Sequence, residues 1–128
     1  MPFGDDSFHR KSAAWQKGMD LATVIYKLTA NFPSDERFGL TNQLRRASVS
    51  IPSNIAEGKG RIGPGELIQF LSIARGSTLE VLTQLELASR LGYSTPAAIS
   101  EAQKLADEEL RILTASLATL RAKATNRK

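Results

Sequence analysis

Residues 40–61 read LTNQLRRASVSIPSNIAEGKGR, and this stretch decides the fold. At about 100° per residue, its apolar side chains fall on one stripe, the pattern of a helix that packs one face on a core. A second apolar line, Phe38, Val49 and Ala56, points away from that stripe. The helix therefore has two faces to bury, which predicts an oligomer. The first stripe consists of Leu40, Leu44, Ala47, Ile51, Ile55 and Gly58.

Hydrogen-bonding side chains form another stripe beside the first, and they are too numerous for an ordinary solvated face. We expect them to take part in a polar network between helices that fixes the register of the bundle. Glu66 and Glu80 offer an acid/base pair as the alternative, but they lie nearly four helical turns apart without an evident nucleophile. The predicted network consists of Asn54, Glu57, Arg75, Ser77 and Glu80.

Turn and cap signals divide the rest of the chain into further helices. Ser12 is a suitable N-cap, and Pro33 followed by Ser34 ends one helix and caps the next. Gly92 and Thr95-Pro96 mark the last boundary. We expect helices at about residues 12–31, 35–59, 64–91 and 96–123. Residues 1–11 are predicted to be a flexible N-terminal arm, residues 12–124 a four-helix bundle and residues 125–128 a basic tail.

Periodicity also predicts which side chains face the core. Trp15, Met19 and Tyr26 recur at helical spacing, so we expect core packing rather than platforms on which bases stack. In the last helix the apolar seam runs through Leu110, and the charged side chains opposite it should face water. Gly76 costs its helix about 1 kcal/mol, a loss that close approach of another backbone would offset.

Composition excludes several classes of function. The chain of 128 residues has no cysteine and one histidine, so disulfides and thiolate metal sites are excluded and other metal sites are disfavoured. The glycine-rich loop of residues 58–65 follows a helix and has no Ser or Thr after its lysine, unlike a P-loop. No apolar run approaches the roughly 20 residues that cross a bilayer, and no signal peptide is evident, so we expect a cytoplasmic protein without membrane contact. We predict no cofactor and no enzymatic activity.

Three segments resemble one known family. They are FPSDERFGL at residues 32–40, SIPSNIAEG at residues 50–58 and FLSIARGSTLE at residues 70–80. They closely resemble the four-helix-bundle family encoded in intervening sequences of bacterial large-subunit rRNA genes, which is related to accessory proteins of diversity-generating retroelements. The resemblance covers roughly residues 14–93. It implies an all-α, antiparallel up-down four-helix bundle that assembles as a ring-like homopentamer without established catalysis. The retroelement accessory proteins that share this resemblance bind a reverse transcriptase and nucleic acid, which suggests similar partners here.

Two functions fit these observations. The net charge of +4 permits a polyanionic partner. The first hypothesis is a homo-oligomer that binds RNA or DNA phosphates through Arg45, Arg46, Lys59 and Arg61, together with the basic C-terminal end. The alternative is a structural scaffold or protein-protein adaptor in which these arginines pair with carboxylates. A reverse transcriptase or a ribosome-related protein is a further expected partner. The basic end contains Arg121, Lys123, Arg127 and Lys128.

Overall fold

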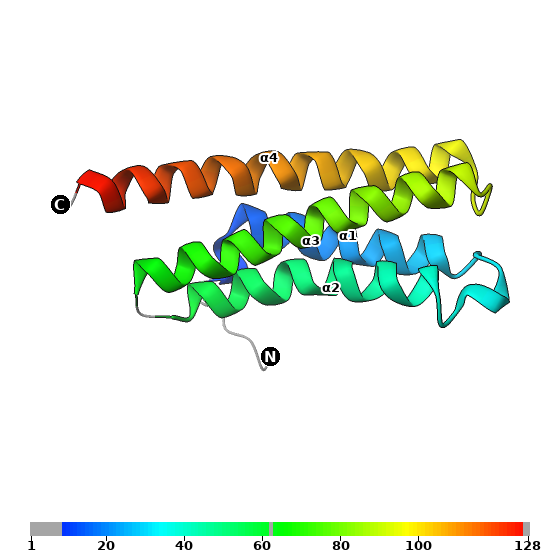
Figure 1. Ribbon diagram of the computed structural model, residues 1–128, viewed down its shortest axis with the longest axis horizontal. Coiled ribbons are helices and arrows are strands. Elements are labelled where there is room, and N and C mark those ends of the chain that lie inside the picture. Colours follow the sequence, from blue (N-terminus) through cyan, green and yellow to red (C-terminus); the bar gives the residue numbers. More distant parts are fainter. Residues whose placement is uncertain (1–8, 62, 127–128) are drawn as a thin grey trace.

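The computed structural model describes residues 9–61 and 63–126. Four long helices lie side by side along the molecule, and the described ranges contain no strand (Figure 1). The predicted all-helical fold is confirmed. The C-terminal end of α4 extends beyond the other helices in this view. The long helices are α1 (Ala13–Thr29), α2 (Leu40–Lys59), α3 (Pro64–Arg90) and α4 (Pro96–Asn126), and two short 3₁₀ turns are η1 (His9–Lys11) and η2 (Ser34–Glu36). Residues 1–8 of the predicted arm, and residues 127 and 128 of the predicted tail, lie outside the described residues.

The core follows the apolar stripe that the sequence indicates. Every member of the α2 stripe is buried, from Leu40 to Gly58. This face packs against Leu21 and Ile25 of α1 and against aliphatic side chains of α3 and α4 within one core cluster. Burying one such Leu or Ile side chain contributes about 1.5–3 kcal/mol, so this stripe is the main reason that α2 takes its place in the bundle.

Side-chain hydrogen bonds connect neighbouring helices. Between α2 and α3, the hydroxyls of Ser50 and Ser77 lie 2.9 Å apart, and Gln84 Nε2 donates to Gln43 Oε1 over 3.4 Å. Between α3 and α4, Arg75 Nε donates to Thr114 Oγ1 over 2.9 Å, and Arg121 Nη2 donates to Ser72 Oγ over 3.2 Å. These contacts fix how far each helix is shifted along its neighbour.

The second helix begins later than predicted. Residues 34–36 form the separate turn η2, and α2 begins only at Leu40, so the predicted start near residue 35 and the Ser34 cap of this helix are wrong. Gly39 is its N-cap and supplies no side chain, and Glu36 Oε1 instead accepts a hydrogen bond of 3.0 Å from the Leu40 amide. A carboxylate is well placed there because the first turn of a helix presents unsatisfied N–H groups.

The two connections at this end of the bundle are joined. Tyr93, in the loop between α3 and α4, donates its hydroxyl hydrogen to Glu36 Oε2 over 2.5 Å. Its ring also packs on Phe32, with centroids 5.5 Å apart. The Tyr93 hydroxyl and the Leu40 amide lower the pKa of Glu36. One carboxylate thus accepts hydrogen bonds from both loops and keeps its charge.

The predicted core positions of Met19, Tyr26 and Leu110 are wrong. Tyr26 is 46 % exposed and Met19 42 % exposed, because they face outward between α1 and α2. Leu110 is only half-buried, whereas its neighbour Glu109 is completely buried. A Cβ atom at Gly76 would meet no atom of the chain within 4 Å, so no close helix contact inside the described chain explains this glycine.

Candidate nucleic-acid interface

The two arginines in the middle of α2 have different surroundings. Arg45 is half-buried: its Nε donates to Thr29 Oγ1 over 2.8 Å, and its guanidinium carbon lies 4.6 Å from the centre of the Tyr26 ring. Arg45 therefore joins α2 to α1. Arg46 is exposed and makes no hydrogen bond or ion pair within the described ranges. It lines an open polar groove of about 390 Å³ between α2 and α3, together with Ser50, Ser77 and Glu80.

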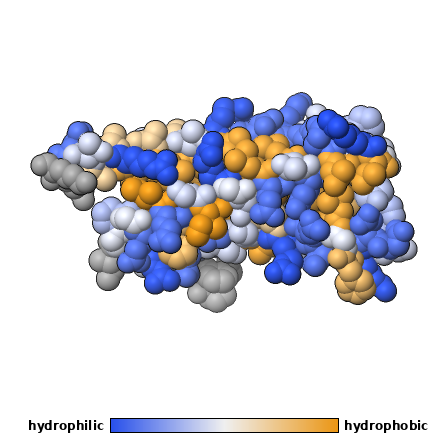
Figure 2. Space-filling view, viewed as in Figure 1, coloured by the Kyte–Doolittle hydropathy of each residue, from blue (hydrophilic) through white to orange (hydrophobic). Residues whose placement is uncertain are grey.

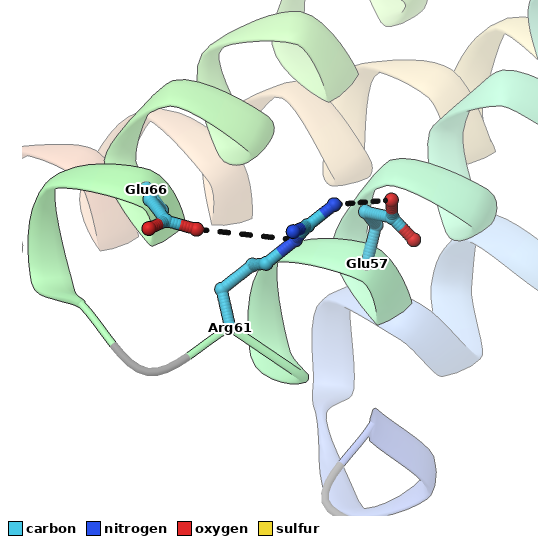
Figure 3. Close-up of polar contacts among 3 residues, drawn as sticks. All are labelled: Glu57, Arg61 and Glu66. Carbon is cyan, nitrogen blue, oxygen red and sulfur yellow. Dashed lines mark hydrogen bonds and ion pairs between the residues drawn. The ribbon is translucent and has the colours of Figure 1, made fainter.

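Lys59 and Arg61 lie at the far end of α2, about 20 Å of helix rise beyond Arg46. Arg61 is bracketed by two carboxylates, as Figure 3 shows, with its Nη2 2.9 Å from Glu57 Oε1 and its Nε 3.9 Å from Glu66 Oε2. Its guanidinium also lies over the Phe70 ring, 5.3 Å from the centroid. The four predicted binding residues thus do not form one continuous patch on a single chain, because Arg45 and Arg61 are engaged locally.

The predicted polar network is divided into separate parts. Asn54 Nδ2 donates to the Ser50 carbonyl over 2.8 Å and to the Ser50 hydroxyl over 3.0 Å, and Ser50 contacts Ser77. Glu57 belongs to the Arg61 cluster, and Arg75 bonds to Thr114. Glu80 is exposed and makes no hydrogen bond or ion pair with the described residues. The network therefore consists of Asn54 and Ser77, joined by Ser50, rather than all five residues.

Additional cations gather at the end of the bundle that holds Lys59. A groove of about 350 Å³ is lined by Ser12 before α1, Lys59 at the end of α2, Leu67 near the start of α3 and Thr119 near the end of α4. These four chain segments therefore meet there. Their flanking cations are Arg10, Lys11, Arg121 and Lys123. We call this end, with Lys59 and the four flanking cations, the basic end.

Apolar side chains are exposed on two other surfaces. A groove of about 610 Å³ between α1 and α2 is lined by Trp15, Met19, Tyr26, Val49 and Pro52. On α3, large aliphatic side chains face outward, and Figure 2 shows hydrophobic surface in several patches over α3 and α4 among hydrophilic side chains. The exposed aliphatic residues are Ile73, Leu79 and Leu87 of α3 and its C-cap residue Leu91.

The buried carboxyl of Glu109 is the feature that sequence analysis missed. It is completely buried, and neither of its oxygens has a hydrogen-bond partner among the residues that the structure describes. Burial raises its pKa to about 8, and Lys17 opposes this effect only in part. Lys17 instead forms an ion pair with Glu108 over 2.6 Å. Gly18 makes room for the carboxyl, because a Cβ atom there would lie 2.8 Å from Glu109 Oε2.

The described residues offer no obvious site for a metal. They contain no group of three or more His, Cys, Asp or Glu side chains arranged to hold an ion. Over the same ranges, every helix is too short or too polar to cross a membrane. The chemistry that this surface offers is thus that of cations, hydroxyls and apolar grooves.

Comparison with known proteins identifies the family. The model of the 23S rRNA-intervening sequence protein family matches residues 10–115. A solved structure, of a protein with unknown function from the S23 ribosomal protein family of Bacteroides thetaiotaomicron, is 25 % identical with a TM-score of 0.74, over 82 % of this chain and 98 % of that chain. No curated protein matches the sequence. The chain belongs to the 23S rRNA-intervening sequence protein family.

Proposed function

We propose that the protein is a non-catalytic homo-oligomer that binds nucleic acid, specifically RNA, through phosphate contacts at the basic end. The observation that carries this proposal is that Lys59 lines one groove together with Ser12 and Thr119. The cations close to those two residues in the sequence, Arg10, Lys11, Arg121 and Lys123, therefore belong to segments that meet at the same end of the bundle. Phosphate contacts of Lys and Arg supply most of the affinity of such interfaces and do not depend on sequence. Arg46 is a further phosphate contact on α2.

Local ion pairing strengthens the argument. The acidic side chains nearest to Lys59 in the sequence, Glu57 and Glu66, both lie against Arg61. Arg61 therefore offsets one of these two negative charges, and neither carboxylate pairs with Lys59 or Lys123. Lys59 and Lys123 are both exposed and make no ion pair within the described ranges. Their ammonium groups are free to neutralise phosphate.

Assembly forms part of the proposal. The groove between α1 and α2 and the outward aliphatic side chains of α3 are different surfaces of one chain, so contact between them would be head-to-tail and would favour a closed ring. A pentamer follows the family resemblance. We also propose an antiparallel up-down order. Its support is that Gln43 near the start of α2 contacts Gln84 near the end of α3, while the later Ser50 contacts the earlier Ser77.

A charge-reversal experiment tests RNA binding. Binding of a fluorescent RNA hairpin is measured by anisotropy at about 50 and about 200 mM salt, between which affinity should fall steeply. Lys59→Glu with Lys123→Glu should lower the affinity at least about tenfold, because two phosphate contacts become repulsive. The control, Arg37→Glu with Lys104→Glu, makes the same change of net charge away from the basic end.

Two outcomes would contradict the proposal. Equal losses in both double variants would mean that only net charge matters. Absence of binding by the wild type at the lower salt concentration would leave the scaffold or adaptor function, with a reverse transcriptase or a ribosome-related protein as a candidate partner. That alternative is favoured by the observation that Arg45 and Arg61 already bind groups of their own chain. For the same reason, the test leaves both residues unchanged.

A further inference from the structure

The groove at the basic end has the dimensions of a small-ligand site. Its volume of about 350 Å³ falls in the usual range of ligand pockets, about 300–1,000 Å³. Its apolar part comes from Ala14, Leu67, Leu71 and Leu120, on three different helices. A flat, largely apolar group could therefore be covered from several sides.

Two hydroxyls of α4 also line this groove. Ser116 and Thr119 are three residues apart, so they share one face of the helix. Neither hydroxyl makes a hydrogen bond with the residues that the structure describes. Both are therefore available to a ligand as donor and as acceptor. No carboxylate occurs among the described residues that line the groove.

One cation lines the groove, and a second follows it on α4. Lys59 lines it from the end of α2. Lys123 lies four residues after Thr119 on α4, one turn farther along the same face. An apolar recess with free hydroxyls, one lysine in its lining and a second lysine one turn farther along α4 matches the chemistry of a nucleotide, in which a flat base with polar edges is flanked by phosphates.

We infer that this groove accepts one unpaired nucleobase of a bound RNA, with the flanking phosphates on Lys59 and Lys123. The inference rests on the proposed function and adds a preference to it. Protein modules that recognise RNA commonly bind unpaired bases, because such bases can leave the helical stack. Paired RNA would meet only the cations, so the groove should favour RNA with an unpaired nucleotide.

The test compares two fluorescent RNA hairpins that differ only in one bulged adenosine. At the same low salt concentration, the wild type should bind the bulged hairpin about tenfold more tightly, the gain expected from burying roughly 60 Å² of apolar base surface at about 25 cal/mol per Å². Ser116→Trp fills the groove without changing charge. It should remove the preference while keeping salt-dependent binding of the paired hairpin. Ala118→Trp is the matched control, because Ala118 is an exposed α4 residue outside the groove.

Thr119→Val covers the case in which the tryptophan variant fails to fold. It removes one hydroxyl at nearly constant volume and should reduce the preference for the bulged hairpin. Equal wild-type affinity for both hairpins would overturn the inference and leave the proposed function intact. Loss of the preference in Ala118→Trp would also overturn it. If Ser116→Trp changed the oligomeric state measured by light scattering, the groove would hold a second copy of the chain instead. Failure of the wild type to bind either hairpin would overturn the proposed function itself.

Discussion

Glu109 is a buried carboxyl whose ionisation is coupled to folding. Its carboxyl is buried without a hydrogen-bond partner in the described part of the chain. Ionising a carboxyl in such a place is costly, so the folded state holds its proton more tightly than the unfolded state does. The neighbouring Glu108 shows the opposite behaviour, because the hydrogen bond from Lys17 lowers its pKa.

The first stability prediction concerns Glu109→Gln. The pKa of Glu109 rises from 4.5 to about 8 on folding, so its unfavourable contribution is absent below pH 4.5 and grows until the pH reaches about 8. Over this window the free energy of unfolding should fall by up to about 1.4 kcal/mol per pH unit because of this group. Urea denaturation from pH 5 to 8 should show a flatter dependence in Glu109→Gln, which has no proton to lose.

Glu108→Gln is the control for this prediction. Its wild-type carboxylate is stabilised in the folded state, so its contribution is lost as the pH falls, the reverse of Glu109. An unchanged pH dependence in Glu109→Gln would show that the carboxyl reaches water or a partner in solution.

Sequence patterns could not identify Glu109. The actual core face of α4 runs through Ile99, Ala102, Ala106, Glu109 and Leu113. A hydropathy pattern prefers Leu110 to Glu109, which moves the predicted stripe by one residue. The missing information is tertiary, because Gly18 lies about ninety residues earlier in the chain and makes room for the carboxyl.

At the level of helices, Gly58 is buried as its place on the apolar stripe predicts, whereas Gly76 has no close contact within its own chain. Gly76 is exposed in the middle of α3, and an added Cβ would meet nothing of its own chain within 4 Å. Gly58, in the last turn of α2, is the position of close contact, since a Cβ there would lie 2.9 Å from Phe70 Cβ and 3.2 Å from Leu67 Cδ1. The propensity cost of a mid-helix glycine was visible in the sequence, but the packing partner was not.

These two glycines give a matched prediction. Gly58→Ala should lower the free energy of unfolding by about 1–3 kcal/mol, because the added methyl group overpacks the contact between α2 and α3. Gly76→Ala should raise it by up to about 1 kcal/mol, because alanine favours the helix and nothing in the chain obstructs it. Urea denaturation checks both values. Stabilisation by Gly58→Ala, or destabilisation by Gly76→Ala without any change in assembly, would contradict this account.

Helix assignments from the sequence succeeded where apolar period and cap agreed. Ser12 accepts a hydrogen bond of 3.2 Å from the Trp15 amide, and Thr95 accepts one of 3.2 Å from the Ala98 amide, so both predicted caps are confirmed. The predicted start of α2 was wrong because Ser34, Asp35 and Glu36 resemble the first turn of a long helix. In the structure they form a separate turn that ends before Gly39.

For the whole molecule, the exposed apolar surface predicts assembly. Light scattering at micromolar concentration should give the molar mass of an oligomer, and that of five chains if the family resemblance extends to assembly. Met19→Glu should weaken the association of the chains. Met19 lines the groove of about 610 Å³ between α1 and α2, and burying a carboxylate there is costly. Ala118→Glu is the control, because Ala118 is exposed on α4 and lies outside both this groove and the aliphatic surface of α3. A monomeric wild type would refute the prediction, and another chain number would refute only the pentamer.

The sequence could not predict which of its cations lie at the same end of the folded molecule. Composition revealed a basic chain, and the sequence singled out Lys59 and the C-terminal cations separately. About sixty residues lie between Lys59 and Lys123, and only the packing of four helices brings their segments around one groove. Arg10 and Lys11 were assigned to an arm, although η1 packs on α1 with His9 and Trp15 ring centroids 5.0 Å apart.

The bond between Tyr93 and Glu36 makes the two ends of the bundle unequal. It joins the α1–α2 loop to the α3–α4 loop, so at that end thermal fluctuations must break a short hydrogen bond before the two loops can separate. At the other end, the ion pairs of Arg61 are exposed to water and cost little to break. We therefore expect fraying to begin at the basic end. The surface proposed to contact RNA is then the part of the molecule with the greatest freedom to adjust its shape to an irregular polyanion.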